Sequence, residues 1–564
     1  MKKKRYTITS ALLYANGPIH IGHLAGAYLP ADIYVRYLKN IGHDVAFICG
    51  SDEHGAAITL QAKKEGCSPK DIIDKYHNLN KKSFDQFGIN FSIYHRTSEK
   101  IHHETAIDFF KKLNLKKVFT QKKSSQFYDT KNKQFLADRY IFGQCPKCGY
   151  QHAYGDQCES CGSTLSPEEL IDPKSKLSGD MPIKKDTKHW YLPMQKHESW
   201  LKKWIDSGEV NNKILHSPKE WKDQVIGQCK SWLNAGLRER AMTRDLDWGV
   251  KVPFENSEGK VLYVWLDAPI GYISATKKWA KENNRDWKDY WQDSNTNLIH
   301  FIGKDNIVFH TIIFPIILHE MEHYILPKNV PANEFLNLEG KKLSTSRNWA
   351  IWLHEFLEDF SNQQDALRYV LCSIAPENKD ADFTWFDFQA RINNELVAIY
   401  GNFVNRVLVL TNKYWDGIVP QKNTLTDLDN SVLKKIAEFP KIIGNYIQEF
   451  KFKKALNEMM NLARLGNKYL ADTEPWKLVK TDPKKTETIM NIGIQITATL
   501  SIVSEPFLPF TSAKLKDALS IKNINWNDSG KEILGKNSKI TLIKPLFKKI
   551  EDNEIKKQLK KLNL

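Results

Sequence analysis

The pattern of apolar and polar positions predicts a β-α-β unit at the start of the chain. Residues 6–9 have the composition of a strand, and apolar residues then recur at positions 24, 28, 31, 35 and 38, the spacing of one helix face. Residues 45–49 are apolar throughout, as buried parallel strands tend to be. In such a unit the functional turn lies at the carboxyl end of the first strand.

The pattern changes twice further along the chain. Between residues 116 and 242 it becomes irregular, with polar loops and tryptophan-rich segments, which indicates an insertion. Strand-like runs return at 260–264 and 298–302, each leading into a helix, and a further helix is predicted at 351–360. After residue 390 the spacing is helical, with helices predicted at 395–411, 431–450, 454–470 and 486–503.

These patterns predict an α/β protein with several domains, because 564 residues exceed what one hydrophobic core holds. We expect a doubly wound, Rossmann-type parallel-sheet domain with a cysteine-rich insertion, followed by an α-helical bundle. The expected boundaries are 1–115 and 243–330 for the two halves of the sheet domain, 116–242 for the insertion, 331–389 for a connecting region, 390–547 for the bundle and 548–564 for a basic tail.

Composition indicates the kind of molecule that the protein binds and the cellular compartment in which it works. The chain has 82 Lys and Arg against 66 Asp and Glu, and a net charge of +16 suits a protein that meets a polyanion such as nucleic acid. A lysine-rich coding bias would give the same excess. Four of the eight cysteines show no disulfide-type spacing, and no signal peptide or membrane-spanning run is present. We expect a cytoplasmic protein that does not bind membranes.

The other four cysteines are the sharpest chemical signal in the sequence. Cys145 and Cys148 form one C-x-x-C knuckle, and Cys158 and Cys161 form a second one shortly after it. Two such pairs can place four thiolates tetrahedrally around one zinc ion. Four thiolates close the coordination shell and exclude a bound water, so we expect a structural metal.

Two further motifs have the chemistry of a nucleotide site. His20 and His23 stand three apart in His-Ile-Gly-His, at the turn where the first helix begins. A helix N-terminus favours phosphate, and imidazoles there can donate hydrogen bonds as charge builds on it. Lys342 opens the segment Lys-Leu-Ser-Thr-Ser in a basic loop, which can close over a triphosphate. Each motif alone is weak, since short matches arise by chance.

In this order and at this separation, the two motifs resemble the ATP signatures of class I aminoacyl-tRNA synthetases. The wider set of motifs resembles the methionyl-tRNA synthetases, from about residue 6 to about residue 548. The additional matching segments are YANGP at 14–18, GSDEHG at 50–55, DRY at 138–140, YVWLDAPIGY at 263–272 and FIGKD at 301–305.

The resemblance implies a ligase that activates L-methionine with ATP and Mg²⁺ and loads it onto methionine tRNA, initiator and elongator alike. The implied catalytic residues are His20, His23 and Lys342. The implied ATP contacts are Gly22, Gly303, Asp305, Lys342, Ser344, Thr345 and Ser346, with Arg244 a further candidate for phosphate. The implied amino-acid pocket is Leu12, Tyr14, Asp52, Trp265, Ala268, Pro269, Tyr272 and His310.

Each of these sets has a physical rationale. A thioether packs well against aromatic rings, and the Asp52 carboxylate suits the substrate ammonium. In the helical bundle the resemblance implies that Asn402, Arg406 and Trp476 read the anticodon. Asn402 and Arg406 lie four apart on one helix face, and a tryptophan can stack on an unpaired base.

The second signature departs from the family pattern at Thr345, where a lysine is usual. We expect the neighbouring Lys341 and Arg347 to supply part of the missing charge. Two alternatives stay open on the sequence. A class I synthetase for isoleucine, valine, leucine or cysteine would share the ATP motifs, although residues 116–242 leave little room for an editing insertion beside the cysteines. A zinc-ribbon nucleic-acid-binding protein without activity would explain the missing lysine.

Many members of the resembled family carry a further C-terminal tRNA-binding or dimerising domain. This chain ends before one could fit, and we expect a monomer.

Overall fold

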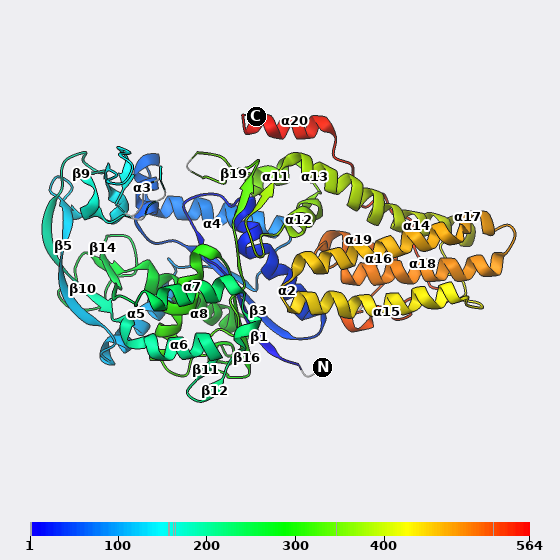
Figure 1. The fold of residues 1–564 in the computed structure, drawn as a ribbon, viewed down its shortest axis with the longest axis horizontal. Helices are drawn as coiled ribbons and strands as arrows, with labels where there is room; N and C mark the ends of the chain where they lie inside the picture. The colour runs from blue at the N-terminus through cyan, green and yellow to red at the C-terminus, as the bar shows by residue number, and fades with distance from the viewer. Residues whose placement is uncertain are drawn as a thin grey trace.

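The molecule is elongated, with a sheet-bearing part at one end and a helical bundle at the other (Figure 1). The computed structural model describes residues 3–155, 158, 160–161, 163, 165–345, 347–522 and 524–563. No helix formed by these residues is both long enough and apolar enough to cross a membrane.

A parallel sheet forms the centre of the first part. Strand β1 (Arg5–Ser10) pairs with β3 (Asp44–Asp52) on one side and with β16 (Thr296–Gly303) on the other. The sheet is extended by β17 (Ala332–Asn333) beyond β16, and by β2 (Leu13–Tyr14) and β4 (Ile93–Arg96), which both pair with β3. After β1 the chain first forms β3 on one side of it and later forms β16 on the other side, so the doubly wound prediction is confirmed. Ligands bind at the carboxyl ends of strands at such a switch point.

The helix after β1 has three parts where the sequence predicts one. These are α1 (Ile21–His23), a π-helical turn η1 (Leu24–Tyr28) and α2 (Leu29–Asn40). The apolar positions predicted for one face are buried, but nearly every other residue of α2 is buried as well. The reason is tertiary, because α2 lies between the sheet and the helical bundle, where Gln448 donates a hydrogen bond to the Tyr37 hydroxyl at 2.7 Å.

The sheet-bearing part contains further helices. They are α3 (Ala56–Glu65), α4 (Pro69–Gln86), α5 (Lys100–Leu115), α8 (Val264–Glu282), α9 (Lys288–Trp291), η7 (Phe309–Ile313) and α10 (Phe314–Glu320). One predicted strand does not join the sheet. Residues 260–264 give β15 (Lys260–Leu262), which pairs antiparallel with β14 (Thr243–Asp245), while Val264 already begins α8. The apolar run is therefore split between a short hairpin and a helix start.

The insertion builds sheets of its own. A four-stranded antiparallel sheet contains β5 (Thr120–Asp129), β6 (Gln134–Phe135), β10 (Ile183–Leu192) and β13 (Arg240–Ala241). A three-stranded sheet beside the cysteines contains β7 (Ile141–Gln144), β8 (Ala153–Tyr154) and β9 (Ile171–Ser175). Two helices, α6 (Glu198–Ser207) and α7 (Asp223–Asn234), pack against the main domain with buried tryptophans.

The predicted helical bundle is present. Its helices are α13 (Trp385–Arg391), η8 (Ile392–Gly401), α14 (Asn402–Trp415), α15 (Asp427–Gln448), α16 (Phe452–Thr473), α17 (Pro475–Leu478), α18 (Pro483–Val503) and α19 (Pro509–Ala518). The connecting region contains α11 (Leu353–Asp359), α12 (Gln364–Ser373), β18 (Leu336–Leu338), β19 (Lys341–Lys342) and β20 (Ala381–Phe383). The basic tail forms α20 (Asp552–Lys561), which returns to the middle of the molecule (Figure 1), where Lys557 pairs with Asp359 at 3.0 Å.

A buried arginine ties the two parts together. Arg368 of α12 has no solvent exposure and donates to Asp32 of α2 at 2.6 Å. It also donates to the carbonyls of Pro506 and Phe507, which precede α19. A buried charge is tolerated only when it is paired and hydrogen-bonded, so these contacts specify how the bundle docks on the sheet-bearing part.

Candidate active site

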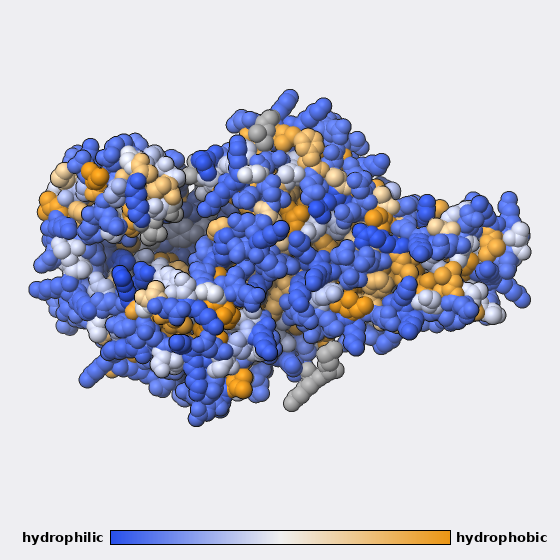
Figure 2. Space-filling model, viewed as in Figure 1, coloured by the Kyte–Doolittle hydropathy of each residue, from blue (hydrophilic) through white to orange (hydrophobic). Residues whose placement is uncertain are grey.

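A cavity of about 760 Å³ lies at the carboxyl ends of β1, β3 and β16. The surface is hollowed between the lobe that carries β5 and β9 and the central body (Figure 2). Ten residues proposed from the sequence line this cavity together: Leu12, Tyr14, His20, Gly22, His23, Asp52, Arg244, Gly303, Asp305 and Lys342. They come from segments more than 300 residues apart, and only the sheet topology brings them to one place.

His20 and His23 stand at the N-terminus of α1 with their rings stacked, the centroids 3.7 Å apart. His20 caps the helix, since its Nδ1 accepts from the Gly22 N–H at 3.1 Å, and His23 Nδ1 accepts from the His20 N–H at 3.3 Å. Burial lowers the pKa of His20 well below its usual value and that of His23 to about 4. Both rings are therefore neutral near pH 7 and carry their proton on Nε2, which leaves two N–H donors at the cavity.

The two signature motifs touch each other. A Cβ on Gly22 would stand 2.6 Å from Leu343 Cδ1, so the two motifs are in close contact at this glycine. Backbone hydrogen bonds also join the segments, from the Ile21 N–H to the Ile351 carbonyl at 3.1 Å and from the Leu353 N–H to the Ile19 carbonyl at 2.9 Å. The helix that presents the imidazoles is thus fixed to the chain that follows the lysine loop.

The lysine loop is a short hairpin. Lys342 and Leu343 line the cavity, whereas Ser344 and Thr345 are not part of its wall. Ser344 and Trp349 exchange backbone hydrogen bonds of 3.0 and 2.9 Å. Ser346, a proposed ATP contact, lies outside the described residues. The neighbour Lys341 lies 4.8 Å above the Trp349 ring, and neither it nor Arg347 lines the cavity.

Two arginines also line the cavity. Arg244, the candidate phosphate contact, lies over the Tyr263 ring at 3.9 Å, and its Nη1 donates to the Thr243 carbonyl at 3.1 Å. Arg139 of the DRY segment also lines the cavity, and the sequence reasoning did not single it out. Its signal was present in that matched segment, but nothing in one sequence says that it faces the nucleotide motifs.

Asp52 ends β3 and is 7% exposed at the cavity wall. Burial, followed by the negative charge of Asp267, raises the pKa of Asp52 to about 7, while His54 acts in the opposite direction. A carboxylate in this setting gains much from a cationic partner, because an ammonium would stabilise its charged form.

The other five proposed pocket residues do not line the cavity. Trp265, Ala268, Pro269 and Tyr272 lie along α8, and His310 lies on η7. Tyr272 and His310 are buried and hydrogen-bonded to each other, with 3.0 Å between Oη and Nε2. Because His310 Nδ1 lies 3.0 Å from the Asn306 carbonyl, it donates there, and Nε2 accepts from the tyrosine. Burial lowers the pKa of His310 to about 4, so this ring is neutral.

A buried network that the sequence reasoning missed lies behind Asp52. The Asp267 carboxylate of α8 is 2.7 Å from His54 Nδ1 and 2.6 Å from His102 Nε2. Beside it, Glu53 is fully buried and accepts hydrogen bonds from Arg96 at 2.8 and 3.0 Å. The available signal was an aspartate within the apolar segment at 263–272, a position that only a buried partner would favour.

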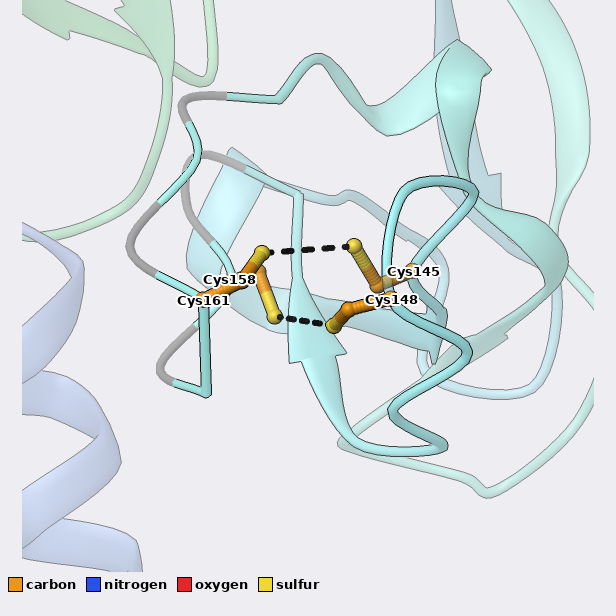
Figure 3. A group of neighbouring side chains, drawn as sticks. All are labelled: Cys145, Cys148, Cys158 and Cys161. Atoms are coloured by element: carbon orange, nitrogen blue, oxygen red, sulfur yellow. Dashed lines mark hydrogen bonds between the residues drawn. The ribbon is translucent and has the colours of Figure 1, made fainter.

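The four cysteine side chains converge from two adjacent loops (Figure 3). The Sγ atoms of Cys145 and Cys161 are 3.9 Å apart, and those of Cys148 and Cys158 are 3.6 Å apart. These separations are far beyond a disulfide bond of about 2.05 Å. They match the edges of a tetrahedron with metal–sulfur bonds of about 2.3 Å, which are roughly 3.8 Å long. The cluster could therefore hold a metal ion.

The three residues proposed to read the anticodon lie together at the far end of the bundle. Asn402 and Arg406 are on α14, and Trp476 is on α17. The Arg406 guanidinium lies 5.8 Å from the centre of the Trp476 ring, and 37% of this tryptophan is exposed. An exposed aromatic ring beside a cation is suited to stack on a base.

Comparison with known proteins defines the class. Residues 6–408 match the family described as tRNA synthetases class I (M), and residues 419–563 match the anticodon binding domain of methionyl tRNA ligase. The fold and the site are those of a class I tRNA synthetase, and the chain belongs to the methionyl tRNA ligase family.

Similar proteins agree along the whole chain. A methionine–tRNA ligase of Cytophaga hutchinsonii is 59% identical, covering 100% of this chain and 81% of its own. One from Bacteroides fragilis is 58% identical, covering 99% and 81%. Among solved structures, Mycobacterium tuberculosis methionyl-tRNA synthetase in complex with methionyl-adenylate has a TM-score of 0.79 at 21% identity, covering 96% of this chain and 99% of that one, which supports the fold.

Proposed function

We propose that this chain activates L-methionine with ATP, giving methionyl-adenylate and pyrophosphate, and then transfers the methionyl group to the 3′-terminal ribose of methionine tRNA. The cavity carries the proposal, because it brings Asp52, the paired imidazoles and Lys342 to the switch point of the sheet. Family membership supplies the substrates. The reaction belongs to translation, and we place it in the cytoplasm.

Each group has a role that its position supports. Asp52 holds the substrate ammonium, and the methionine carboxylate attacks the α-phosphate. The neutral imidazoles of His20 and His23 donate Nε2–H hydrogen bonds as negative charge builds on that phosphate. Lys342 faces the departing pyrophosphate, and Mg²⁺ accompanies ATP as part of the substrate. Catalysis is then mainly positioning and charge stabilisation.

The charge lost at Thr345 is supplied by two other basic residues of the cavity wall. Lys341 and Arg347 were the sequence-based candidates, but Arg139 and Arg244 are the basic residues that line the cavity with Lys342. We therefore assign to these two arginines the part of the triphosphate that a second signature lysine would contact.

Amino-acid-dependent ATP–pyrophosphate exchange, measured across all twenty amino acids, tests the activation step. Exchange with methionine alone supports the proposal. Exchange with isoleucine, valine, leucine or cysteine would overturn the substrate, and no exchange at all would favour the nucleic-acid-binding alternative. Aminoacylation of methionine tRNA then tests the second step.

We propose that the cysteine cluster holds one structural zinc ion. All four ligands are thiolates, which zinc accepts in a closed tetrahedral shell. Metal analysis should give one zinc per chain, and Cys145→Ser with Cys158→Ser should lose it. Because bound metal contributes folding energy to a small module, protease sensitivity should rise in residues 141–175 and not in the bundle. A metal-free wild type with an intact insertion would contradict this assignment.

A further inference from the structure

The atoms that meet at Asp267 share protons and not a metal ion. His54, His102 and Asp267 are all buried, and three such side chains form a possible ligand set. The carboxylate oxygens are, however, 2.7 and 2.6 Å from the two ring nitrogens, which is the length of charge-assisted hydrogen bonds. Ligands of one tetrahedral metal with bonds of about 2.1 Å would stand roughly 3.4 Å apart.

The charge of the Asp267 carboxylate determines which groups donate in these two hydrogen bonds. An ionised carboxylate only accepts, so His54 donates through Nδ1 and His102 through Nε2. Burial raises the pKa of Asp267, but the two histidines more than offset this and hold it well below its usual range. Burial lowers the pKa of His54, and the Asp267 carboxylate outweighs it, so that pKa lies above its usual value.

The network joins two parts of the proposed amino-acid pocket. His54 lies two residues after Asp52, and its backbone N–H is 3.5 Å from Asp52 Oδ1. Asp267 lies on α8 between Trp265 and Ala268, two residues of the proposed pocket. The Asp267–His54 hydrogen bond therefore fixes the loop that carries Asp52 against the helix that carries the pocket wall.

His102 supports this arrangement from a third element. It lies on α5 with no solvent exposure, and its Nδ1 is 2.9 Å from the Ser274 hydroxyl of α8. Packing leaves little freedom there, since a Cβ on Gly271 would stand 2.8 Å from Leu12 Cδ1 and 3.9 Å from His102 Cε1. His102 does not line the cavity and so acts only through Asp267.

We propose that Asp267 and His102 are positioning residues for substrate recognition: they hold His54, and through it the Asp52 carboxylate, in the orientation that pairs with the amino-acid ammonium. This inference rests on the proposed function, which assigns the ammonium to Asp52. It predicts that a substitution in the network weakens recognition of the substrate's amino group and does not weaken ATP binding.

The first variant is Asp267→Asn, which keeps the shape of the side chain. Its amide oxygen can still accept from one ring, but its NH₂ group can only donate to the other, so one hydrogen bond is lost and neither ring faces a charged acceptor. We expect the KM for methionine in pyrophosphate exchange to rise about tenfold or more, as for loss of a hydrogen bond to a charged group, while the KM for ATP changes less than twofold.

The second measurement isolates the ammonium. Isothermal titration compares methionine with its analogue that lacks the amino group. Wild type should prefer methionine, and Asp267→Asn should lose about tenfold of that preference. His102→Gln can place an amide N–H near the position of Nε2 and should stay close to wild type, whereas His102→Leu should resemble Asp267→Asn.

His95→Gln is the matched control. His95 is a buried histidine of β4 in the same region, and its ring nitrogens have no hydrogen-bond partner among the described residues. This variant should leave both the methionine KM and the amino-group preference unchanged.

The outcomes separate this inference from the proposed function. A loss that affects methionine, the amino-free analogue and ATP alike, with a lower melting temperature, would mean that the network is merely structural. If wild type activates a different amino acid, the proposed function fails, and the same variants test the network with that amino acid and its amino-free analogue. A wild type that binds no amino acid would overturn both.

Discussion

The two parts of the molecule bury different kinds of side chain. All 17 histidines lie within the first 354 residues, and the helical bundle has none. The sheet-bearing part buries imidazoles, Glu53 and Asp267 beside its cavity, whereas the bundle core is built largely from isoleucine, leucine, methionine and aromatic residues. Buried polar groups of the bundle hold its segments together, as where Gln495 donates to the Leu534 carbonyl at 2.8 Å.

This contrast separates chemistry from recognition. A site that stabilises a changing charge needs oriented, desolvated polar groups, and burying them costs stability unless every partner is in place. A domain that presents a reading surface needs only a rigid scaffold, and an apolar core supplies one. The proposed roles follow this division, with activation in the sheet-bearing part and anticodon reading on the bundle.

The largest effect should come from the paired imidazoles. His23→Asn keeps an acceptor for the His20 N–H but removes the Nε2–H donor. The rate of ATP–pyrophosphate exchange should fall about 10²- to 10³-fold, as when one donor to a transition-state charge is removed. The bundle should keep its hydrogen-exchange protection. A loss below tenfold would mean that His23 is a helix cap and not a catalytic group.

A change on the bundle should weaken tRNA charging and leave amino-acid activation intact. Trp476→Ala removes a stacking surface worth about 1–3 kcal/mol per base, so kcat/KM for tRNA charging should fall roughly 5- to 150-fold. Pyrophosphate exchange, which needs no tRNA, should not change. Phe386→Ala, at another exposed aromatic residue, is the control and should leave tRNA charging unchanged. Loss of exchange in the Trp476 variant would argue for a packing role.

Acidic pH should destabilise the sheet-bearing part and leave the helical bundle unchanged. Burial lowers the pKa of His103 and His310 to about 4 and that of His77 and His95 to about 3. Unfolded histidines bind protons below about pH 6.5, so unfolding takes up protons and stability is lost as the pH falls from 6.5 towards 4.

Hydrogen exchange measured at pH 7 and pH 5, corrected for the intrinsic rate, checks this expectation. Protection should fall around the cavity and stay constant in the bundle, where no imidazole is present to titrate. Equal loss in both parts would show that they unfold as one unit or that carboxylates dominate.

The smallest effect is expected at Thr345, where the second signature motif departs from the family pattern. If Arg139 and Arg244 already supply the missing charge, Thr345→Lys should change the rate of pyrophosphate exchange less than tenfold, or about 1.4 kcal/mol. Arg139→Gln should cost more than that. A gain above tenfold in the Thr345 variant would instead show that this loop lacks a charge that nothing replaces.

Local signals in the sequence were sufficient for several features. The cysteine spacing predicts the cluster because four ligands within 17 residues meet without help from distant segments. The order of strands and helices predicts the parallel sheet, and the helical spacing after residue 390 predicts the bundle. Of the strand expected at 260–264, residues 260–262 form β15, and the strand ends early because Val264 already begins α8.

Long-range contacts account for what the sequence did not show. No local pattern places Arg139 and Lys342 in one cavity, or shows that Trp265 and Tyr272 lie outside its wall. The π-helical turns η1 and η7, beside His23 and at His310, likewise interrupt segments that the apolar spacing alone predicts as α-helix. Each depends on packing between segments far apart in the chain.

The sequence by itself determined the family, the order of the elements and the residue types that the chemistry needs, because motifs and periodicity are local properties. Only the tertiary structure decided how those residues act together. The neutral state of the paired imidazoles arises mainly from burial, and the raised pKa of Asp52 and the network through Asp267 arise from burial and from partners more than 40 residues away. Desolvation and hydrogen bonding are properties of a packed site, and they exist only after the chain has folded.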